Sequence, residues 1–145
     1  MRYRERLWPA WWVFVATALV IPASFLVFLP ISVPAGYLSA VVLYGAIVTI
    51  LLTTSSVIEV TDGMLRVGRA RIERSFLGEV TGHAGAEAFA ERGTRLDARA
   101  WLKLRGWIPG VVRIELIDPA DPTPYWLVST RRPEQLAAAL TSVVE

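Results

Sequence analysis

The side chains that could carry acid–base chemistry are few and lie close together in the chain. His83, the only histidine, is followed by Glu87 and Glu91, which are four residues apart. A histidine can act as a general base or a pH sensor, and two carboxylates on one helix face can transfer protons. Because no second histidine, cysteine or Ser-Asp pattern accompanies His83, we expect a structural role for it. We expect the two glutamates to lie on an exposed helix face.

Oxygen ligands for a metal ion are concentrated in the proline-rich stretch 118–124, which contains Asp118, Asp121 and Thr123. Calcium takes six or more oxygens at a defined spacing, and the prolines account for a rigid loop here without an ion. The sequence contains no cysteine, no metal-ligand spacing, no phosphate-binding loop and no dinucleotide fingerprint. We therefore expect no catalytic residues, no metal and no cofactor.

Arginines form the most distinctive polar pattern, because they gather on both sides of a long apolar run. Three arginines between residues 2 and 6 precede the run, and four between 66 and 74 follow it. Basic side chains next to a membrane attract anionic lipid with about 1 kcal/mol each. Alternatively, these arginines only determine topology and cover solvated strands, and Glu73 and Glu79 dilute the second group. The residues that we predict at the inner leaflet are Arg2, Arg4, Arg6, Trp8, Trp11, Trp12, Arg66, Arg69, Arg71, Arg74 and Trp107.

The apolar run extends from Leu7 to Ile58 and contains no Asp, Glu, Lys, Arg or His. A helix needs about 20 apolar residues to cross about 30 Å of hydrocarbon, so the run is long enough for two spans. Prolines at 30 and 34 interrupt it, and we predict a helical hairpin with spans over about 8–29 and 35–54. Because a second span follows at once, we expect a retained anchor and not a cleaved signal peptide. We expect Pro22 to kink the first span.

Positive charge flanks the hairpin on the side of the two chain ends, and the loop between the spans is uncharged. Because basic flanks stay in the cytoplasm, we expect a multi-pass protein of the plasma membrane with both termini inside. The tryptophans at 8, 11 and 12 then belong to the inner headgroup layer. Small residues such as Gly36, Ala40 and Gly45 would let the helices approach closely, or they are ordinary membrane-helix composition.

The charge balance of the remaining chain argues against nucleic-acid binding. The charged residues before Glu59 are Arg2, Arg4, Arg6 and Glu5. From Glu59 onward, twelve basic residues therefore balance twelve acidic ones. A nucleic-acid binder needs a clustered positive excess. The partners that we expect are the lipid bilayer and a membrane protein or a second copy of the chain, and no nucleic acid.

Beyond the run the sequence is typical of a small β domain, and we divide the chain into an anchor, 1–56, and a cytoplasmic domain, 57–145. Apolar and polar residues alternate on both sides of Asp62-Gly63, a strong hairpin signal because glycine accepts a positive φ. Gly68-Arg69 predicts the next turn. Alternating segments at 100–105, 111–116 and 125–130 predict further strands, so we expect six or seven antiparallel strands in all.

Two helices complete the predicted domain. Residues 84–91 favour one or two helical turns closed by Gly93. Pro133 favours a C-terminal helix from its first turn, with Leu136, Leu140, Val143 and Val144 on one face. The tryptophans at 101, 107 and 126 belong either to the core or to a headgroup contact. The predicted fold class is an α+β membrane protein, a two-helix transmembrane hairpin followed by a small antiparallel β-barrel capped by this helix.

This order of strands and helix resembles the bacterial pleckstrin-homology-like domain, a seven-strand barrel capped by a C-terminal helix that often follows paired membrane spans. Over the whole chain, the sequence is similar to a family of small actinobacterial membrane proteins, domain of unknown function 3093. The segments that carry this resemblance are YRERLWP at 3–9, EVTDG at 59–63, LRVG at 65–68 and DPADPTPYWLVSTRRP at 118–133. The resemblance implies location and architecture, and no functional residues, because the family has no assigned activity.

Without a catalytic set, the sequence favours a non-enzymatic role. The first hypothesis is a membrane-anchored docking or scaffolding module for a membrane complex. The second is a sensor that binds a lipid or small molecule in the barrel or between barrel and helix. The third is an enzyme that acts on envelope lipid with His83 and a carboxylate.

Overall fold

The computed structural model describes residues 3–142, and the chain forms two compact units. Trp8–Ser55 is the helical unit, and the chain up to Leu7 together with the chain from Ser56 is the β unit. The predicted domain boundary places the residues before Trp8 in the anchor. In the structure they form strand β1 (Tyr3–Arg6), which pairs with β2 (Val57–Val60) in the β unit.

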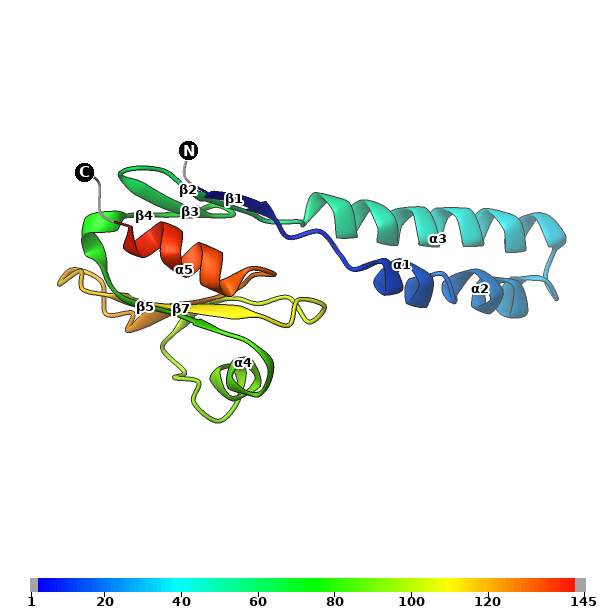
Figure 1. The fold of residues 1–145 in the computed structure, drawn as a ribbon. Coiled ribbons are helices and arrows are strands. Elements are labelled where there is room, and N and C mark those ends of the chain that lie inside the picture. The colour runs from blue at the N-terminus through cyan, green and yellow to red at the C-terminus, as the bar shows by residue number, and fades with distance from the viewer. Residues whose placement is uncertain (1–2, 143–145) are drawn as a thin grey trace. The chain divides into compact units, whose positions relative to one another are not determined.

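The helical unit is a hairpin of two apolar segments (Figure 1). The first contains α1 (Trp11–Thr17) and α2 (Val20–Phe28), and the second is α3 (Val33–Thr53). They measure 18 and 21 residues, and both are long and apolar enough to cross a membrane. The helix is interrupted at Ala18 and Leu19, one turn before Pro22, where the kink was predicted, because proline has no N–H and its ring crowds the carbonyl one turn earlier.

Several hydroxyl groups of the helical unit find their partners inside it. Thr17, Ser24 and Thr49 each donate to the carbonyl four residues earlier, at 2.7–2.8 Å. Tyr44 donates to the Phe14 carbonyl of the facing segment at 3.1 Å. Hydrocarbon offers no other partner to a polar group, so this arrangement suits a membrane environment.

Small residues contribute to the helix contact at two of the predicted positions. Gly36 and Ala40 are buried in the helical unit. A Cβ at Gly36 would lie 3.1 Å from Phe25 Cδ1, so the glycine allows α2 and α3 to approach closely. Gly45, in contrast, faces open space.

The β unit contains two four-stranded sheets followed by the predicted C-terminal helix, and the strands of residues 3–142 do not close into a barrel. Sheet A has the order β1-β2-β3-β4, and sheet B has the order β5-β7-β8-β6. The 3₁₀ turn η1 (Arg74–Phe76) follows sheet A, and the chain then begins β5 in a second layer. Among residues 3–142 no ladder joins the two sheets. The pair β6–β8 is parallel, which was not predicted. The remaining bounds are β3 (Met64–Val67), β4 (Ala70–Glu73), η1 (Arg74–Phe76), β5 (Leu77–His83), β6 (Trp101–Lys103), β7 (Val111–Leu116) and β8 (Tyr125–Ser129).

The turns of sheet A lie at the glycine positions where they were predicted, although one of them does not have the expected backbone geometry. The hairpin between β2 and β3 turns at Asp62-Gly63, but Gly63 does not adopt a positive φ. Thr61 closes this turn by donating its N–H and its hydroxyl to the Met64 carbonyl, at 3.0 and 3.1 Å. Gly68, in the next turn, adopts a positive φ of 60°.

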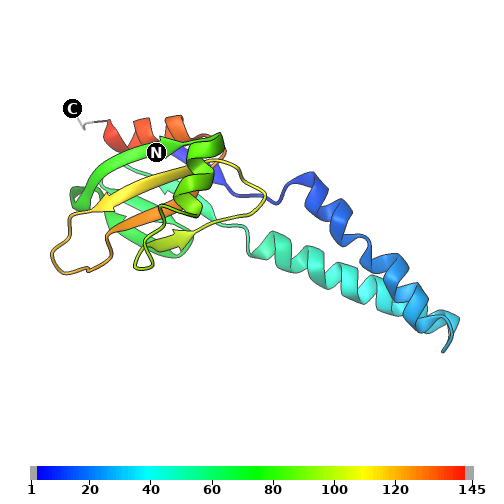
Figure 2. The same ribbon diagram turned by 90° about the horizontal axis from the view of Figure 1, so that it is seen from below.

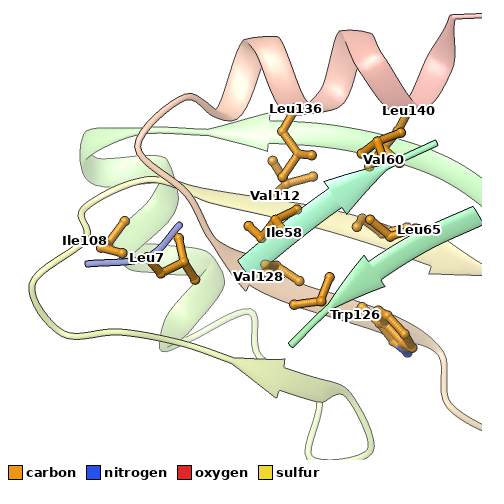
Figure 3. Packing of buried hydrophobic residues seen from close by; sticks show 12 residues of the cluster. Leu7, Ile58, Val60, Leu65, Ile108, Val112, Trp126, Val128, Leu136 and Leu140 are labelled. Carbon is orange, nitrogen blue, oxygen red and sulfur yellow. The ribbon is translucent and has the colours of Figure 1, made fainter. Parts of the chain in front are cut away.

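The main core lies between the two sheets and α5 (Pro133–Thr141), as Figures 1 and 3 show. Its residues are Leu7, Ile58, Val60, Leu65, Val67, Ile108, Val112, Ile114, Trp126, Val128, Leu136 and Leu140. Burying a large aliphatic side chain stabilises the fold by about 1.5–3 kcal/mol. The predicted helix face is confirmed at Leu136 and Leu140, whereas Val143 and Val144 lie outside the described residues.

Two glycines allow α5 to begin close to sheet B. A Cβ at Gly82 would lie 2.9 Å from the carbonyl carbon and oxygen of Pro133. A Cβ at Gly110 would lie 2.5 Å from the Thr130 carbonyl oxygen. Since no real Cβ approaches backbone so closely, any side chain at these positions would displace the start of α5.

The second face of sheet B is covered by α4 (Gly85–Arg92), which confirms the helical turns predicted there (Figure 2). Ala88 of α4 packs with Val111, Tyr125 and Leu127 in a second, smaller core. All five residues of β8 are buried because this strand lies between two layers.

Candidate functional site

The outer face of sheet A collects arginines from two distant parts of the sequence. The register places Arg4 opposite Glu59, Glu59 opposite Arg66, and Arg66 opposite Arg71, so one row of side chains crosses all four strands. Arg6 lies on the same face, because side chains two residues apart on a strand point to one side. We call Arg4, Arg6, Arg66 and Arg71 the arginine face.

The arginine face is exposed and only partly neutralised. Glu59 Oε1 lies 3.5 Å from Arg4 Nε, and Glu59 Oε2 lies 3.7 Å from Arg66 Nη1. Glu73 is the second acid on this side of the sheet, so four arginines against two glutamates leave a net charge of +2. A hollow of about 210 Å³ opens here, lined by Glu59, Thr61, Met64, Arg66 and Arg71. Exposed ion pairs contribute little in water, so Arg4 and Arg66 remain available to an external anion.

The other two arginines of the second cluster are placed differently. Arg69 is exposed in the turn between β3 and β4. Arg74 Nη2 donates to the carbonyls of Ala139, Leu140 and Ser142 at 3.2, 2.8 and 2.8 Å. These carbonyls end α5, where the helix dipole is negative and a cation stabilises it. Arg74 therefore has a structural role as a helix cap.

Strand β1 is held in place by Glu5, on the side opposite to the arginine face. Glu5 is 9% exposed. Its Oε2 accepts hydrogen bonds from Thr130 Oγ1 and, at 2.7 Å, from the Tyr3 hydroxyl, and its Oε1 accepts one from the Arg131 N–H at 2.9 Å. Sequence reasoning missed this clip, although the alternation of Glu5 with the neighbouring arginines was a signal for its inward side chain. Arg2, which precedes the strand, lies outside the described residues.

The same environment changes the acidity of Tyr3. Burial raises the pKa of its phenol from 10.0 to about 12, and the hydrogen bond to Glu5 and the charge of Glu5 act in the same direction. The hydrogen bond with Thr130 acts in the opposite direction. Tyr3 therefore remains a donor to Glu5 far above neutral pH.

The predicted membrane-contact tryptophans fall into two groups. Trp8, Trp11 and Trp12 belong to the helical unit and are 45%, 77% and 49% exposed. Trp107 packs against the main core and buries its Nε1 without a hydrogen-bond partner among residues 3–142, and Trp126 is a core residue. The core interpretation therefore applies to Trp107 and Trp126, and headgroup contact stays a prediction for the first three.

The acid–base candidates of the sequence meet beneath α4. Thr81 and His83 share one face of β5, and Arg113, paired with Thr81, lies on the same face of β7. Glu91 is brought to them by α4. The prediction of two exposed glutamates is confirmed for Glu87 and wrong for Glu91, whose side chain is 5% exposed because it is on the inner side of the helix.

Three basic side chains surround the buried carboxylate. Glu91 Oε1 lies 3.4 Å from Arg95 Nη1 and 3.9 Å from His83 Nε2, and Oε2 lies 3.6 Å from Arg113 Nη1. His83 Nε2 is instead within hydrogen-bond distance of Thr81 Oγ1, at 3.1 Å. Beside these groups is a groove of about 280 Å³, lined by Glu79, Thr81, His83, Glu91, Arg113 and Glu115. Nothing in the sequence indicated that Arg113 belongs to this site, apart from its place in a strand of alternating apolar and polar residues.

The carboxylates of the proline-rich loop, 118–124, accept hydrogen bonds from N–H groups of the same loop. Asp118 Oδ1 accepts the Ala120 N–H, and Asp121 Oδ1 accepts the Thr123 N–H, both at 2.9 Å. The Thr123 N–H lowers the pKa of Asp121 by stabilising its charged form. Within residues 3–142, no group of three or more His, Cys, Asp or Glu side chains is arranged to hold a metal ion.

Comparison with known proteins places the chain in a family and supplies no activity. Residues 2–140 match the model of a family described as "Protein of unknown function (DUF3093)", which confirms the family resemblance. No curated protein matches the chain, and no solved structure matches it. The pleckstrin-homology-like resemblance and the actinobacterial source therefore stay predictions.

Proposed function

The chain belongs to the DUF3093 family, whose function is not assigned, and from its geometry we propose a non-enzymatic, membrane-anchored docking module. In this proposal the arginine face lies against anionic lipid headgroups of the cytoplasmic leaflet and holds the β unit there as a scaffold for a membrane complex. One observation carries the proposal. The pairing of β1 with β2 joins arginines that precede the first apolar segment to arginines that follow the second.

The helical unit supplies the anchor. Its two segments have the length and composition of membrane spans, and hydroxyl groups along both segments donate to helix carbonyls. A bilayer would cover the exposed apolar side chains of these segments, such as Trp11, Leu26 and Val41. The basic flanks favour an orientation with both termini in the cytoplasm.

Short connectors keep the strands of the arginine face near the lipid surface in the proposed arrangement. Four residues separate β1 from α1, and three separate α3 from β2. An extended residue spans at most about 3.6 Å, and attraction to charged headgroups extends over a Debye length of about 8 Å at physiological salt. At about 1 kcal/mol per unit of charge, the net +2 of the face favours contact with an anionic surface by about 2 kcal/mol.

A single spin label on the arginine face tests the proposal. Because the chain has no cysteine, Met64→Cys places one label on the outer face of sheet A, and Phe89→Cys places the control label on α4. The full chain is reconstituted in nanodiscs of neutral or partly anionic lipid, with a paramagnetic relaxation agent on the headgroups. We expect relaxation enhancement at position 64 that increases with anionic lipid and decreases with salt, and none at position 89.

Charge substitutions test whether lipid contact depends on the arginine face itself or only on the total charge of the protein. Arg71→Ser should weaken the signal at position 64, whereas Arg99→Ser, which removes the same charge from an exposed residue outside the face, should leave it unchanged. If the signal at position 64 is independent of anionic lipid, or if both substitutions act equally, the docking proposal is wrong.

The second candidate function, a sensor for a small molecule, is favoured by the groove beneath α4. The groove contains a buried carboxylate oxygen without a hydrogen-bond donor among the described residues. The enzymatic hypothesis rests on His83 and Glu91, which lie 3.9 Å apart. Loss of His83 without a change in envelope lipids would exclude it.

A further inference from the structure

We propose that the groove beneath α4 binds a small organic molecule through a primary ammonium group, which donates a hydrogen bond to Glu91 Oε2. The groove is the hollow between β5, β7 and α4 that Glu79, Thr81, His83, Glu91, Arg113 and Glu115 line. This proposal does not depend on docking of the arginine face to lipid.

The buried carboxylate is the first argument. The Glu91 side chain is 5% exposed, and its Oε2 is buried and accepts no hydrogen bond from residues 3–142. Arg113 Nη1 lies 3.6 Å from Oε2, which is within ion-pair distance but beyond hydrogen-bond distance. A buried carboxylate oxygen that accepts no hydrogen bond destabilises the fold. A ligand that donates a hydrogen bond to this oxygen would therefore gain binding free energy.

The charge of the lining favours a cation. Glu79, Glu91 and Glu115 contribute three carboxylates to the lining, against Arg113 and a single histidine, and Arg95 Nη1 pairs with Glu91 Oε1 from outside the lining at 3.4 Å. Arg113 is already engaged, because its guanidinium lies 4.1 Å from the centre of the Tyr125 ring and its Nη2 lies 3.8 Å from Glu115 Oε1. An anionic ligand would meet three negative side chains and a cation that is shared with other groups.

The arrangement of the acids favours an ammonium group over a metal ion. Among the described residues, no three metal-ligating side chains converge. A primary ammonium carries three donors and needs no fixed coordination geometry. Besides Glu91 Oε2, the groove offers it the Thr81 hydroxyl and the carboxylate of Glu79 or Glu115. A volume of about 280 Å³ limits the ligand to a small molecule or to the headgroup of a lipid.

The single histidine provides a unique reporter for the test. The full chain is prepared in nanodiscs with labelled histidine, and the imidazole resonance of His83 is followed during titration with ethanolamine. Choline has the same charge without an N–H donor, and acetate is the anionic control. We expect a saturable shift with ethanolamine, at least about tenfold weaker binding of choline, and no shift with acetate. A second set of nanodiscs replaces phosphatidylcholine with phosphatidylethanolamine, and a shift there without added amine identifies a lipid headgroup as the source.

Variants show whether Glu91 is the acceptor. Glu91→Gln should weaken ethanolamine binding by about ten- to hundredfold, whereas Glu87→Gln, four residues earlier on the exposed side of α4, should leave it unchanged. If Glu91→Gln does not fold, Glu115→Gln at the rim replaces it and should also weaken binding. Equal affinity for ethanolamine and choline, binding unaffected by these variants, or no shift with ethanolamine or phosphatidylethanolamine would each overturn the proposal.

Discussion

Replacing Glu5 with alanine is expected to release strand β1 from the β unit. Two donors of the clip, the Thr130 hydroxyl and the Arg131 N–H, would lose a charged acceptor, and each such bond is worth about 1.5–3 kcal/mol. Tyr3 is only half-buried and can turn to water, so its bond adds little. The Thr130 hydroxyl can instead donate to the Tyr3 hydroxyl, 3.4 Å away, which lowers the loss. We therefore expect β1 to be destabilised by about 3 kcal/mol.

Hydrogen exchange measures this opening directly. The Leu7 N–H donates to the Ser56 carbonyl at 2.8 Å where β1 ends, and it becomes free when β1 detaches. A loss of about 3 kcal/mol raises its exchange rate by roughly a hundredfold, provided that local opening controls exchange. Glu5→Gln keeps the shape and one acceptor oxygen, so its effect should be smaller.

The control for this prediction is Arg4→Ala, which changes an exposed neighbour on the other side of the same strand. Its effect on Leu7 exchange should stay within about 0.5 kcal/mol. If Glu5→Ala and Arg4→Ala accelerate exchange equally, β1 is held by its backbone ladder alone and the clip contributes nothing. If the clip is real, Glu5→Ala should also reduce contact of the arginine face with anionic lipid, because two of its four arginines leave with β1.

Two further predictions concern the stability of the β unit. Arg74→Ala should lower its free energy of unfolding by about 2 kcal/mol, because the carbonyls at the end of α5 lose a charged donor. Chemical denaturation of the full chain in micelles measures this, and an equal loss for Arg71→Ala would contradict the capping role. The pKa of Tyr3 is raised from 10.0 to about 12 on folding, so its contribution to stability is complete below pH 10 and is lost as the pH rises through about 12. The phenolate absorbance that Tyr3→Phe removes should therefore titrate near pH 12, and a transition at pH 10 would show that the phenol is not buried.

Local features of this protein were predictable because each depends on neighbours in the sequence. The helix break before Pro22 and the start of α5 at Pro133 follow from backbone restrictions of proline. The turn at Asp62-Gly63 lies at its predicted position, although Gly63 does not adopt the positive φ on which that prediction rested. The two long apolar helices follow from composition over a window of about 20 residues. Their insertion into a membrane remains part of the proposal.

Burial of individual acids was not predictable, because it depends on partners from other elements. Glu5 and Glu91 have side chains that are usually exposed, and alternation or helical spacing shows only which residues share a face. Glu5 is buried because the connection between β8 and α5 supplies donors for its carboxylate. Glu91 is buried because α4 packs on sheet B near Arg113.

The amino-acid sequence alone determined the apolar hairpin, the arginine clusters on both sides of it, and the strand and helix segments of the remaining chain. Only the tertiary structure decided that these clusters form one face, because β1 pairs with β2 across the whole apolar run. It also decided that the strands form two sheets and not a barrel, and that a groove with a buried carboxylate lies beneath α4. The physical reason is that strand pairing and burial depend on contacts between distant segments, which residue type and local periodicity do not encode.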